Sequence, residues 1–189
     1  MRHKLIAALV ILSPMVLLVL VLVLLASGPS SLPPLPNPNG YDDLIKASAA
    51  VVGNAGDYPT LSRESLAGLV SSNTEALRLL RRGLTNQCLM PMDSALTNTA
   101  GMADQMACMK RLVQLLAAEG RLRELDGQPA DAARSYTDAI RFGNELSRGG
   151  VLITYLTGLA CEAVGGQPLA KVVPKLSPEQ ARVVLRACQ

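Results

Sequence analysis

Histidine is nearly missing from this chain: the only one among its 189 residues is His3, at the N-terminus. Catalysis by Ser-His-Asp or Cys-His groups and zinc sites ligated by histidine are therefore excluded from the rest of the sequence. The motifs G-x-G-x-x-G, G-x-S-x-G, S-x-x-K and C-x-x-C and the Gly-Lys-Ser/Thr phosphate loop are absent as well. We therefore expect no enzyme, no bound cofactor and no small-molecule substrate.

Aromatic side chains are also scarce, with four Tyr, one Phe and no Trp, and no stretch alternates apolar and polar residues as a strand would. Apolar residues instead recur at steps of three and four, which is typical of helices with one buried face. One such helix opens at Ser62 and ends near Gly83, and a second carries an apolar stripe from Met102 to Gly120. Pro129 suits the first turn of a third helix. The sequence thus predicts an all-α domain.

Two further helices complete this prediction. Gly149 and Gly150 break the chain before an apolar helix that runs through Val164. The last helix starts at an N-cap serine, a first-turn proline and a capping-box glutamine, in the run Ser177-Pro178-Glu179-Gln180. We expect these helices to form a bundle or an array of helical hairpins.

Charge is absent from residues 5–26, which include nine Leu, five Val and two Ile. As a helix they would span roughly 33 Å, enough to cross a hydrocarbon core of about 30 Å. Cleavage after Gly28 would leave Pro29 next to the broken bond, which makes a poor protease substrate. We therefore favour an uncleaved signal anchor over a cleaved signal peptide, with residues 1–26 forming a cytoplasmic tip and one transmembrane helix.

The charges around this span set its orientation. Arg2 and Lys4 precede it, and the next basic residue is Lys46. The positive-inside rule places the N-terminus in the cytoplasm and the rest of a single-pass inner-membrane protein outside it. Since two of the 18 Lys and Arg precede the span, 16 remain against 15 Asp and Glu. This near-neutral balance gives no reason to expect nucleic acid as a partner.

A proline-rich linker is expected between the anchor and the domain. Residues 27–40 read SGPSSLPPLPNPNG, which favours a semi-rigid polyproline spacer. The extracytoplasmic all-α domain then covers residues 41–189, enough for one hydrophobic core. The segment 37–44 and the turn at 148–150 resemble parts of bacterial membrane-anchored proteins of unknown activity.

Residues 113–145 predict a helical hairpin with its turn near Gly127. Small residues and one aromatic recur in it at a characteristic spacing: Gly120, Gly127, Ala132, Tyr136 and Ala139. The segment resembles one tetratricopeptide repeat, in which small residues allow close helix crossing and the aromatic fills the gap. Arg123 and Asn144 depart from that pattern. The resemblance implies a helix–turn–helix geometry and protein binding on a concave face; the alternative is a hairpin of an ordinary bundle.

Arginines supply the candidate partner-binding residues. Arg134, Arg141 and Arg148 recur every seven residues, displaced from the buried face of their helix. Such a basic ridge suits an acidic partner segment, and the alternative is a plain solvated face. A second basic group is expected to be a solvated surface: Arg78, Arg81 and Arg82.

Sulfur side chains are concentrated between residues 88 and 109. The cluster consists of Cys88, Met90, Met92, Met102, Met106, Cys108 and Met109. Thiolates and thioethers are the ligands that Cu(I) selects, but methionine on an apolar helix stripe also fills core gaps. The four cysteines allow three two-bridge pairings. A Cys88–Cys108 bridge is plausible, and Cys161 is expected to be a buried thiol.

These features together predict a non-catalytic, membrane-anchored helical scaffold or adaptor that binds protein outside the cytoplasm. The alternative, from a different class, is an extracytoplasmic module that binds a soft metal such as copper through the sulfur cluster at 88–109. The absence of histidine argues against a third possibility, an enzyme that uses carboxylates distant in sequence.

Overall fold

The structure, a computed structural model, describes residues 34–91, 99–148 and 150–188. Leu35–Gln189 forms one compact unit, and its described residues are helical, with no strand. The α-helices are α2 (Gly40–Ala49), α3 (Arg63–Ser72), α4 (Thr74–Gly83), α6 (Thr99–Leu125), α7 (Pro129–Ser147), α8 (Leu152–Val172) and α9 (Pro178–Ala187). The short 3-10 helices are η1 (Tyr58–Thr60) and η2 (Val173–Lys175). The all-α prediction is confirmed.

The predicted anchor, residues 1–26, lies outside the described residues. Sulfur-bearing Met92 lies outside them as well. Among the helices that the structure does describe, none combines the length and the apolar character needed to cross a bilayer.

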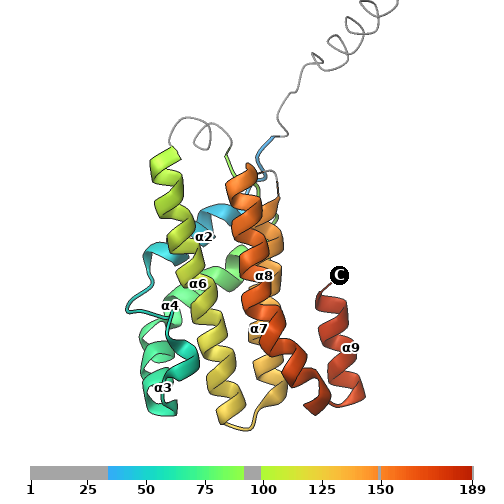
Figure 1. Cartoon of the computed structure of the whole chain (residues 1–189). Coiled ribbons are helices and arrows are strands. Elements are labelled where there is room, and N and C mark those ends of the chain that lie inside the picture. Colours follow the sequence, from blue (N-terminus) through green and yellow to red (C-terminus); the bar gives the residue numbers. More distant parts are fainter. Residues whose placement is uncertain (1–33, 92–98, 149, 189) are drawn as a thin grey trace, which may run out of the picture. The chain divides into compact units, whose positions relative to one another are not determined.

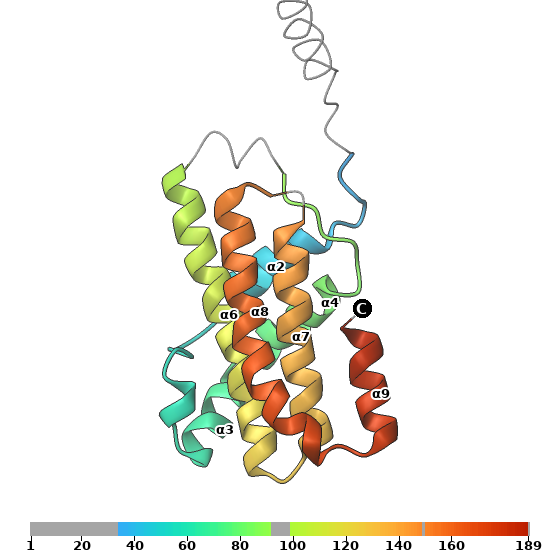
Figure 2. The same ribbon diagram turned by 45° about the vertical axis from the view of Figure 1, so that its right-hand side comes forward.

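Three long helices, α6, α7 and α8, lie side by side at the centre of the helical unit (Figure 1). α6 and α7 form a hairpin, and α8 packs along α7 and also contacts α6. α2, α3 and α4 also contact α6, and α9 packs against α7. Figure 2 shows α2 and α4 behind the three long helices and α9 beside α7. α7 is therefore the helix that α9 and the main bundle share.

The interior consists mainly of aliphatic and sulfur side chains. α6 contributes the stripe that the sequence predicted, and its members are buried: Met102, Met106, Met109, Val113 and Leu116. Tyr136 and Phe142 of α7 are the largest fully buried side chains. The apolar stripe that the sequence predicted on α6 is confirmed.

Two glycines allow the long helices to approach closely. A Cβ at Gly120 in α6 would lie 2.4 Å from Cε1 of Tyr136, so the tyrosine ring fills the space that a side chain would need. A Cβ at Gly143 in α7 would lie 2.5 Å from the carbonyl oxygen of Gly158 in α8. The contact predicted between Gly120 and Tyr136 is thus present. The resemblance of this hairpin to a tetratricopeptide repeat stays a prediction.

The single helix expected from Ser62 to Gly83 is wrong. The chain forms α3 and α4 instead, and the two helices meet at Asn73. The buried Asn73 amide accepts a hydrogen bond from the Val52 N–H at 2.7 Å and donates to the carbonyl oxygens of Val52 and Leu69 at 2.9 and 2.8 Å. Two of these bonds reach Val52, 21 residues away, so the cause of the break is not visible in the local sequence. The apolar periodicity simply continues through it.

α8 also differs from the prediction, since it continues past Val164 to Val172 even though Pro168 lies inside it. Gly165 serves packing here: a Cβ at this position would lie 2.5 Å from the carbonyl oxygen of Tyr136. The longer helix leads through η2 to α9. The predicted capping box of α9 is confirmed, with Ser177 Oγ accepting from the Gln180 N–H at 3.2 Å.

The chain enters the helical unit through Asn39 and Gly40, which are both buried, and Gly40 starts α2. The Asn39 side chain donates to the carbonyl oxygen of Leu89 at 2.7 Å and accepts from the Leu89 N–H at 3.0 Å. The Gly40 N–H donates to the carbonyl oxygen of Gln87 at 3.0 Å. The end of the predicted linker is therefore fastened to the segment that follows α4.

Candidate functional site: a groove between α7 and α9

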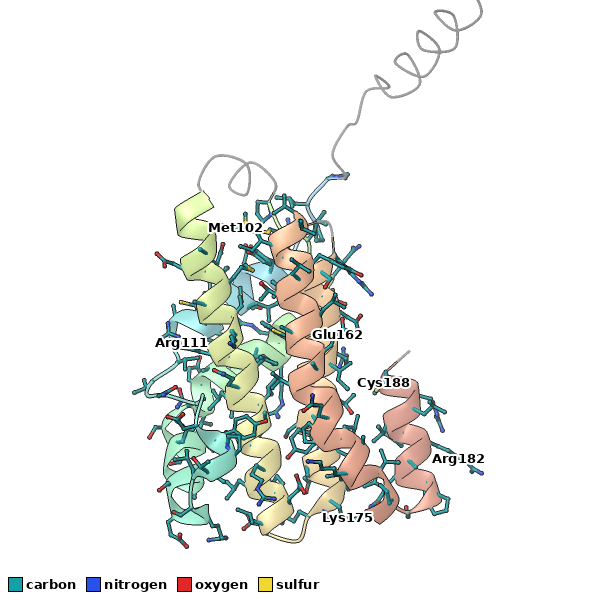
Figure 3. The ribbon with its side chains drawn as sticks, in the orientation of Figure 1. Met102, Arg111, Glu162, Lys175, Arg182 and Cys188 are labelled. Atoms are coloured by element: carbon teal, nitrogen blue, oxygen red, sulfur yellow. The ribbon has the colours of Figure 1, made fainter. Side chains whose placement is uncertain are left out.

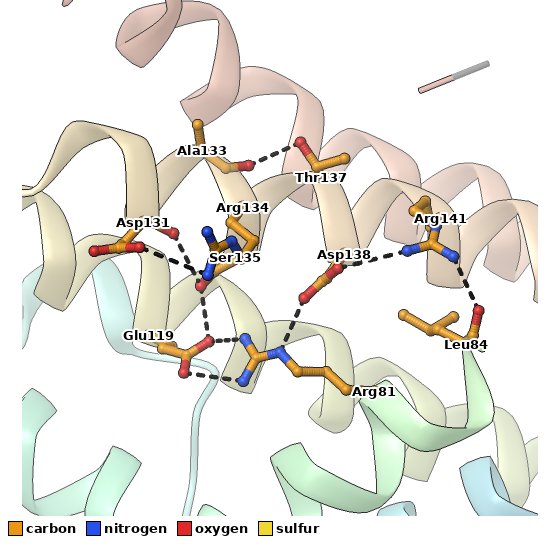
Figure 4. A network of polar contacts seen from close by, with 10 residues as sticks. All are labelled: Arg81, Leu84, Glu119, Asp131, Ala133, Arg134, Ser135, Thr137, Asp138 and Arg141. Atoms are coloured by element: carbon orange, nitrogen blue, oxygen red, sulfur yellow. Dashed lines mark hydrogen bonds and ion pairs between the residues drawn. The ribbon is translucent and has the colours of Figure 1, made fainter. Parts of the chain in front are cut away.

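Arg81 of α4 is the centre of a polar network that joins three helices (Figure 4). Its guanidinium forms two hydrogen bonds with the carboxylate of Glu119 in α6. Its Nε lies 3.0 Å from Oδ2 of Asp138 in α7. The Ser135 hydroxyl of α7 donates to Glu119 Oε2 at 2.7 Å. The network therefore fixes the position of α7 relative to α4 and α6.

The two carboxylates in this network are almost completely buried, with Glu119 and Asp138 only 7% and 9% exposed. Burial raises the pKa of Asp138, and the neighbouring Arg81 only partly opposes this. Burial would lower the pKa of Arg81, but its bonds to Glu119 and Asp138 outweigh that effect and raise it. Arg141 lies 3.9 Å from Asp138. Two cations thus face two carboxylates, and the charges balance.

Asp138 also lines a groove of about 480 Å³ between α7 and α9. One wall is apolar and comes from α9 and the turn before it: Leu176, Val183, Val184 and Ala187. The opposite wall comes from α7 and carries polar side chains: Arg134, Thr137, Asp138 and Arg141. Ala130 and Gln180 complete the lining. We call this site the α7–α9 groove. Its α9 wall is apolar, and its α7 wall carries two arginines and one carboxylate.

α9 forms the outer wall of the groove and is held loosely, since none of its described residues is buried. Figure 3 shows Lys175 at the turn before this helix, Arg182 pointing away from α7, and Cys188 near the end of the chain. A helix with little buried surface shifts at low energetic cost.

The structure places two of the three predicted arginines in this groove. The Arg134 side chain is 76% exposed and lies 3.9 Å from Asp131. Arg141 is half-buried and donates to the carbonyl oxygen of Leu84 at 2.9 Å. Arg148 pairs with Glu145 at 3.2 Å and does not line the groove. The three side chains therefore do not form one uniform ridge, and Arg134 is the one whose charge faces the groove with least constraint.

The sulfur side chains lie mostly in the main hydrophobic core. Its buried members include Cys88, Met90, Met102, Met106 and Met109. Cys108 is partly exposed, and its sulfur accepts a hydrogen bond from Arg111 at 3.0 Å. This placement supports the interpretation of the methionines as core packing. Copper binding by the cluster stays a prediction.

All four cysteines are free thiols, so the suggested Cys88–Cys108 bridge is not formed. The Cys88 thiol lies 3.6 Å from the carbonyl oxygen of Gly83, and Cys161 is buried in α8, as expected. Burial raises the pKa of both Cys88 and Cys161 to about 12. The thiolate is the reactive form, so burial and the raised pKa both disfavour reaction of these thiols at neutral pH.

The basic group on α4 is balanced by acids. Arg82 forms an ion pair with Asp43 of α2, and this bond lowers the pKa of the Asp43 carboxyl. Arg78 donates to Glu75 at 2.7 Å. Arg78 and Arg82 are exposed, as a solvated face requires, but the same interpretation is wrong for Arg81 because the polar network holds it. None of the three arginines lacks a carboxylate partner.

The sequence does not predict that Glu119 and Asp138 both pair with Arg81, although one signal was available. Glu119 follows the apolar run at 115–118 on a helix with a buried stripe, and a carboxylate in such a place requires a partner. Nothing local identifies Arg81 as that partner, because it lies 38 residues away. Within the ranges that the structure describes, no three His, Cys, Asp or Glu side chains gather closely enough to hold a metal ion.

The oxygen atoms of the buried carboxylates Glu119 and Asp138 are engaged by Arg81, Ser135 and Arg141. The α7–α9 groove adjoins this network through Asp138. The chain matches no protein-family model, and no curated protein or solved structure is significantly similar to it.

Proposed function

We propose that this protein is a non-catalytic, membrane-anchored helical scaffold or adaptor that binds a segment of another protein in its α7–α9 groove. The observation that carries the proposal is the pairing of an apolar wall on α9 with a basic wall on α7. Amphipathic helices bind grooves of this kind through apolar anchors, and acidic residues beside those anchors would meet Arg134. Non-catalytic action fits a domain sequence without histidine.

The membrane part of the proposal rests on the uncharged stretch at residues 5–26 and on the basic residues before it. In this arrangement the proline-rich linker holds the helical unit near the outer surface of the inner membrane. The groove then selects proteins that reach that compartment.

Protease added to intact spheroplasts tests the topology. The helical unit should be digested, while a tag fused to the N-terminus should stay protected. A protected helical unit, or a mature N-terminus near Pro29, would contradict an N-in anchor.

Site-specific photo-crosslinking tests the groove. A photo-reactive amino acid replaces Gln180, which lines the groove, or Val52, which is exposed elsewhere. In the full chain in its native membranes, the groove position should give a discrete crosslinked species, and the Val52 position should not.

Charge reversal then tests the basic wall. Arg134→Glu should weaken the crosslink from Gln180 because it removes the positive charge that an acidic segment requires. The matched control is Arg182→Glu, on α9 but outside the groove lining, which should leave the crosslink unchanged. Equal crosslinking in both variants would remove Arg134 from the binding site.

A further inference from the structure

We propose that the outward face of α8 is an interface between two copies of this chain, paired as antiparallel helices about a two-fold axis. This surface belongs to a different helix from both walls of the α7–α9 groove. The pairing therefore adds to partner binding and does not depend on it.

The two opposite faces of α8 differ in burial. One face packs into the helical unit through Thr154, Gly158, Cys161, Gly165, Leu169 and Val172. The other carries small and apolar residues at alternating steps of four and three, all exposed except the half-buried Gly166, and we call it the α8 stripe: Leu152, Leu156, Leu159, Ala163, Gly166 and Ala170. Its three leucines are 73%, 54% and 43% exposed. Figure 1 shows α8 at the front of the unit, with no labelled helix across this side.

The spacing of the α8 stripe is that of a coiled-coil seam, in which apolar residues repeat every 3.5 positions on average. Any helix that presents one continuous apolar face shows this spacing, so it defines the extent of the face. The stripe extends over 19 positions, roughly 27 Å of helix at about 1.5 Å per residue. The stripe is therefore long enough for a second helix to lie along it.

The order of large and small residues identifies that helix as a second α8. The leucines occupy the first half of the stripe and the small residues the second half, and the spacing reads the same in both directions. In an antiparallel pair Leu152 opposes Ala170, Leu156 opposes Gly166, and Leu159 opposes Ala163. Each leucine then enters a space that a small residue leaves. This self-complementarity is what a two-fold interface requires.

Charge and area are consistent with this pairing. The charged residues of α8, Glu162 and Lys171, both lie off the stripe. Ile153 and Tyr155 flank the stripe and are 40% and 50% exposed. With the three leucines they expose roughly 500 Å² of apolar surface, near the upper end for monomers. If the pairing covered this surface completely on both copies, about 1,000 Å² would be buried, which is the threshold for a biological interface and below its standard size.

Crosslinking of the full chain in its membranes tests the pairing. In a background of Cys108→Ser and Cys188→Ser, the double variant Leu152→Cys with Ala170→Cys is treated with a short bismaleimide. Antiparallel pairing should give a covalent dimer from the double variant and none from either single variant, because each position faces the other one in the second copy. A dimer from Leu152→Cys alone would overturn this arrangement.

The same experiment distinguishes a second copy of the chain from anything else that could cover the α8 stripe. Labelling of both thiols by a soluble maleimide, without a dimer, would show a free stripe and overturn the proposal. Thiols that are neither labelled nor crosslinked would show a lipid surface or a different protein on the stripe, which also overturns it.

A matched pair of glycine variants tests the register without disturbing the fold of each copy. A Cβ at Gly166 or at Gly68 in α3 would meet nothing within 4 Å, so each copy accepts a larger side chain at either position. Gly166→Leu should reduce the crosslinked dimer about tenfold or more, because it fills the space for Leu156 of the second copy. Gly68→Leu should leave the dimer unchanged. An undiminished dimer in Gly166→Leu would overturn the proposed register.

Discussion

Two arginines one turn apart on α4, Arg78 and Arg81, differ in role according to the partners that they reach. Arg78 bonds to Glu75 one turn earlier in the same helix, and both side chains are exposed. Arg81 lies one turn later and reaches the buried carboxylates of α6 and α7. An exposed pair gains little because water screens it, whereas removal of a partner from a buried group leaves an uncompensated charge.

The first prediction compares these two arginines by the same substitution. Arg81→Met should lower the free energy of unfolding by about 2–4 kcal/mol, somewhat less than for a fully buried ion pair because Arg81 is partly exposed. Arg78→Met should leave stability nearly unchanged. Thermal unfolding of the full chain in detergent, followed by circular dichroism, measures both. Equal melting temperatures for the two variants would contradict the role given to Arg81.

The second prediction concerns the contact between α6 and α7. Gly120→Ala should cost about 1–3 kcal/mol, since the new methyl group would displace the ring of Tyr136. The matched control is Gly68→Ala in α3, where the added methyl meets open space. That change should stabilise the fold by about 0.5–1 kcal/mol, because alanine favours a helix over glycine. Chemical denaturation of both variants measures the difference, and the two changes should have opposite signs.

Among the helices, α9 depends most on local interactions. None of its described residues is buried, so its order comes from the capping box at Ser177 and from the contact of its inner side with α7. α3 also starts with a capping serine, Ser62, but it buries Leu66. The two helices therefore respond differently to the loss of a cap.

The third prediction follows from this difference. Ser177→Ala should destabilise α9 by about 0.5–2 kcal/mol and accelerate amide hydrogen exchange at residues 181–185, with little change in the global melting temperature. The groove crosslink from Gln180 should weaken as its outer wall frays. In the control Ser62→Ala, exchange in α9 should stay as in the wild type. Unchanged exchange in Ser177→Ala would mean that contacts with α7, not the cap, hold the helix.

Elements whose ends depend on neighbouring residues were predicted well from the sequence, and those that depend on distant residues were not. The start of α9 was predicted because the serine, proline and glutamine that define it are neighbours in the chain. The break between α3 and α4 was missed because Asn73 bonds to Val52, 21 residues away. The end of α8 was misplaced because Gly165 signals termination locally, while its actual role is close packing on α7. The groove could not be predicted, since it depends on where α8 ends.

At the scale of the whole molecule, the burial of the cysteine side chains shows whether the hydrophobic core is folded. Cys88 lies in the main core cluster with the methionines of α6, and Cys161 joins α8 to the same cluster. Cys188 is exposed at the end of α9. The sequence predicted the burial of Cys161 from its apolar surroundings, but the environment of Cys88 depends on α2 and could not be read locally.

The fourth prediction uses these thiols as probes. At pH 7.5 a soluble maleimide should modify Cys188 rapidly and Cys108 more slowly, while Cys88 and Cys161 should react only after unfolding. Their pKa of about 12 leaves almost no thiolate below about pH 10. Mass spectrometry of peptides from labelled native and denatured chain identifies the modified sites. Modification of Cys88 in the native chain would contradict its burial beneath α2.

The fastening of Asn39 has a mechanical consequence. Any pull transmitted along the preceding residues reaches the helical unit first at Asn39 and Gly40, where the load divides among the bonds to Leu89 and Gln87. Those bonds join the entering chain to the segment after α4, and α4 is in turn joined to α6 and α7 through Arg81. Tension is thereby spread into the interior before it can peel α2 away. These bonds therefore resist a force applied at the N-terminal end of the helical unit.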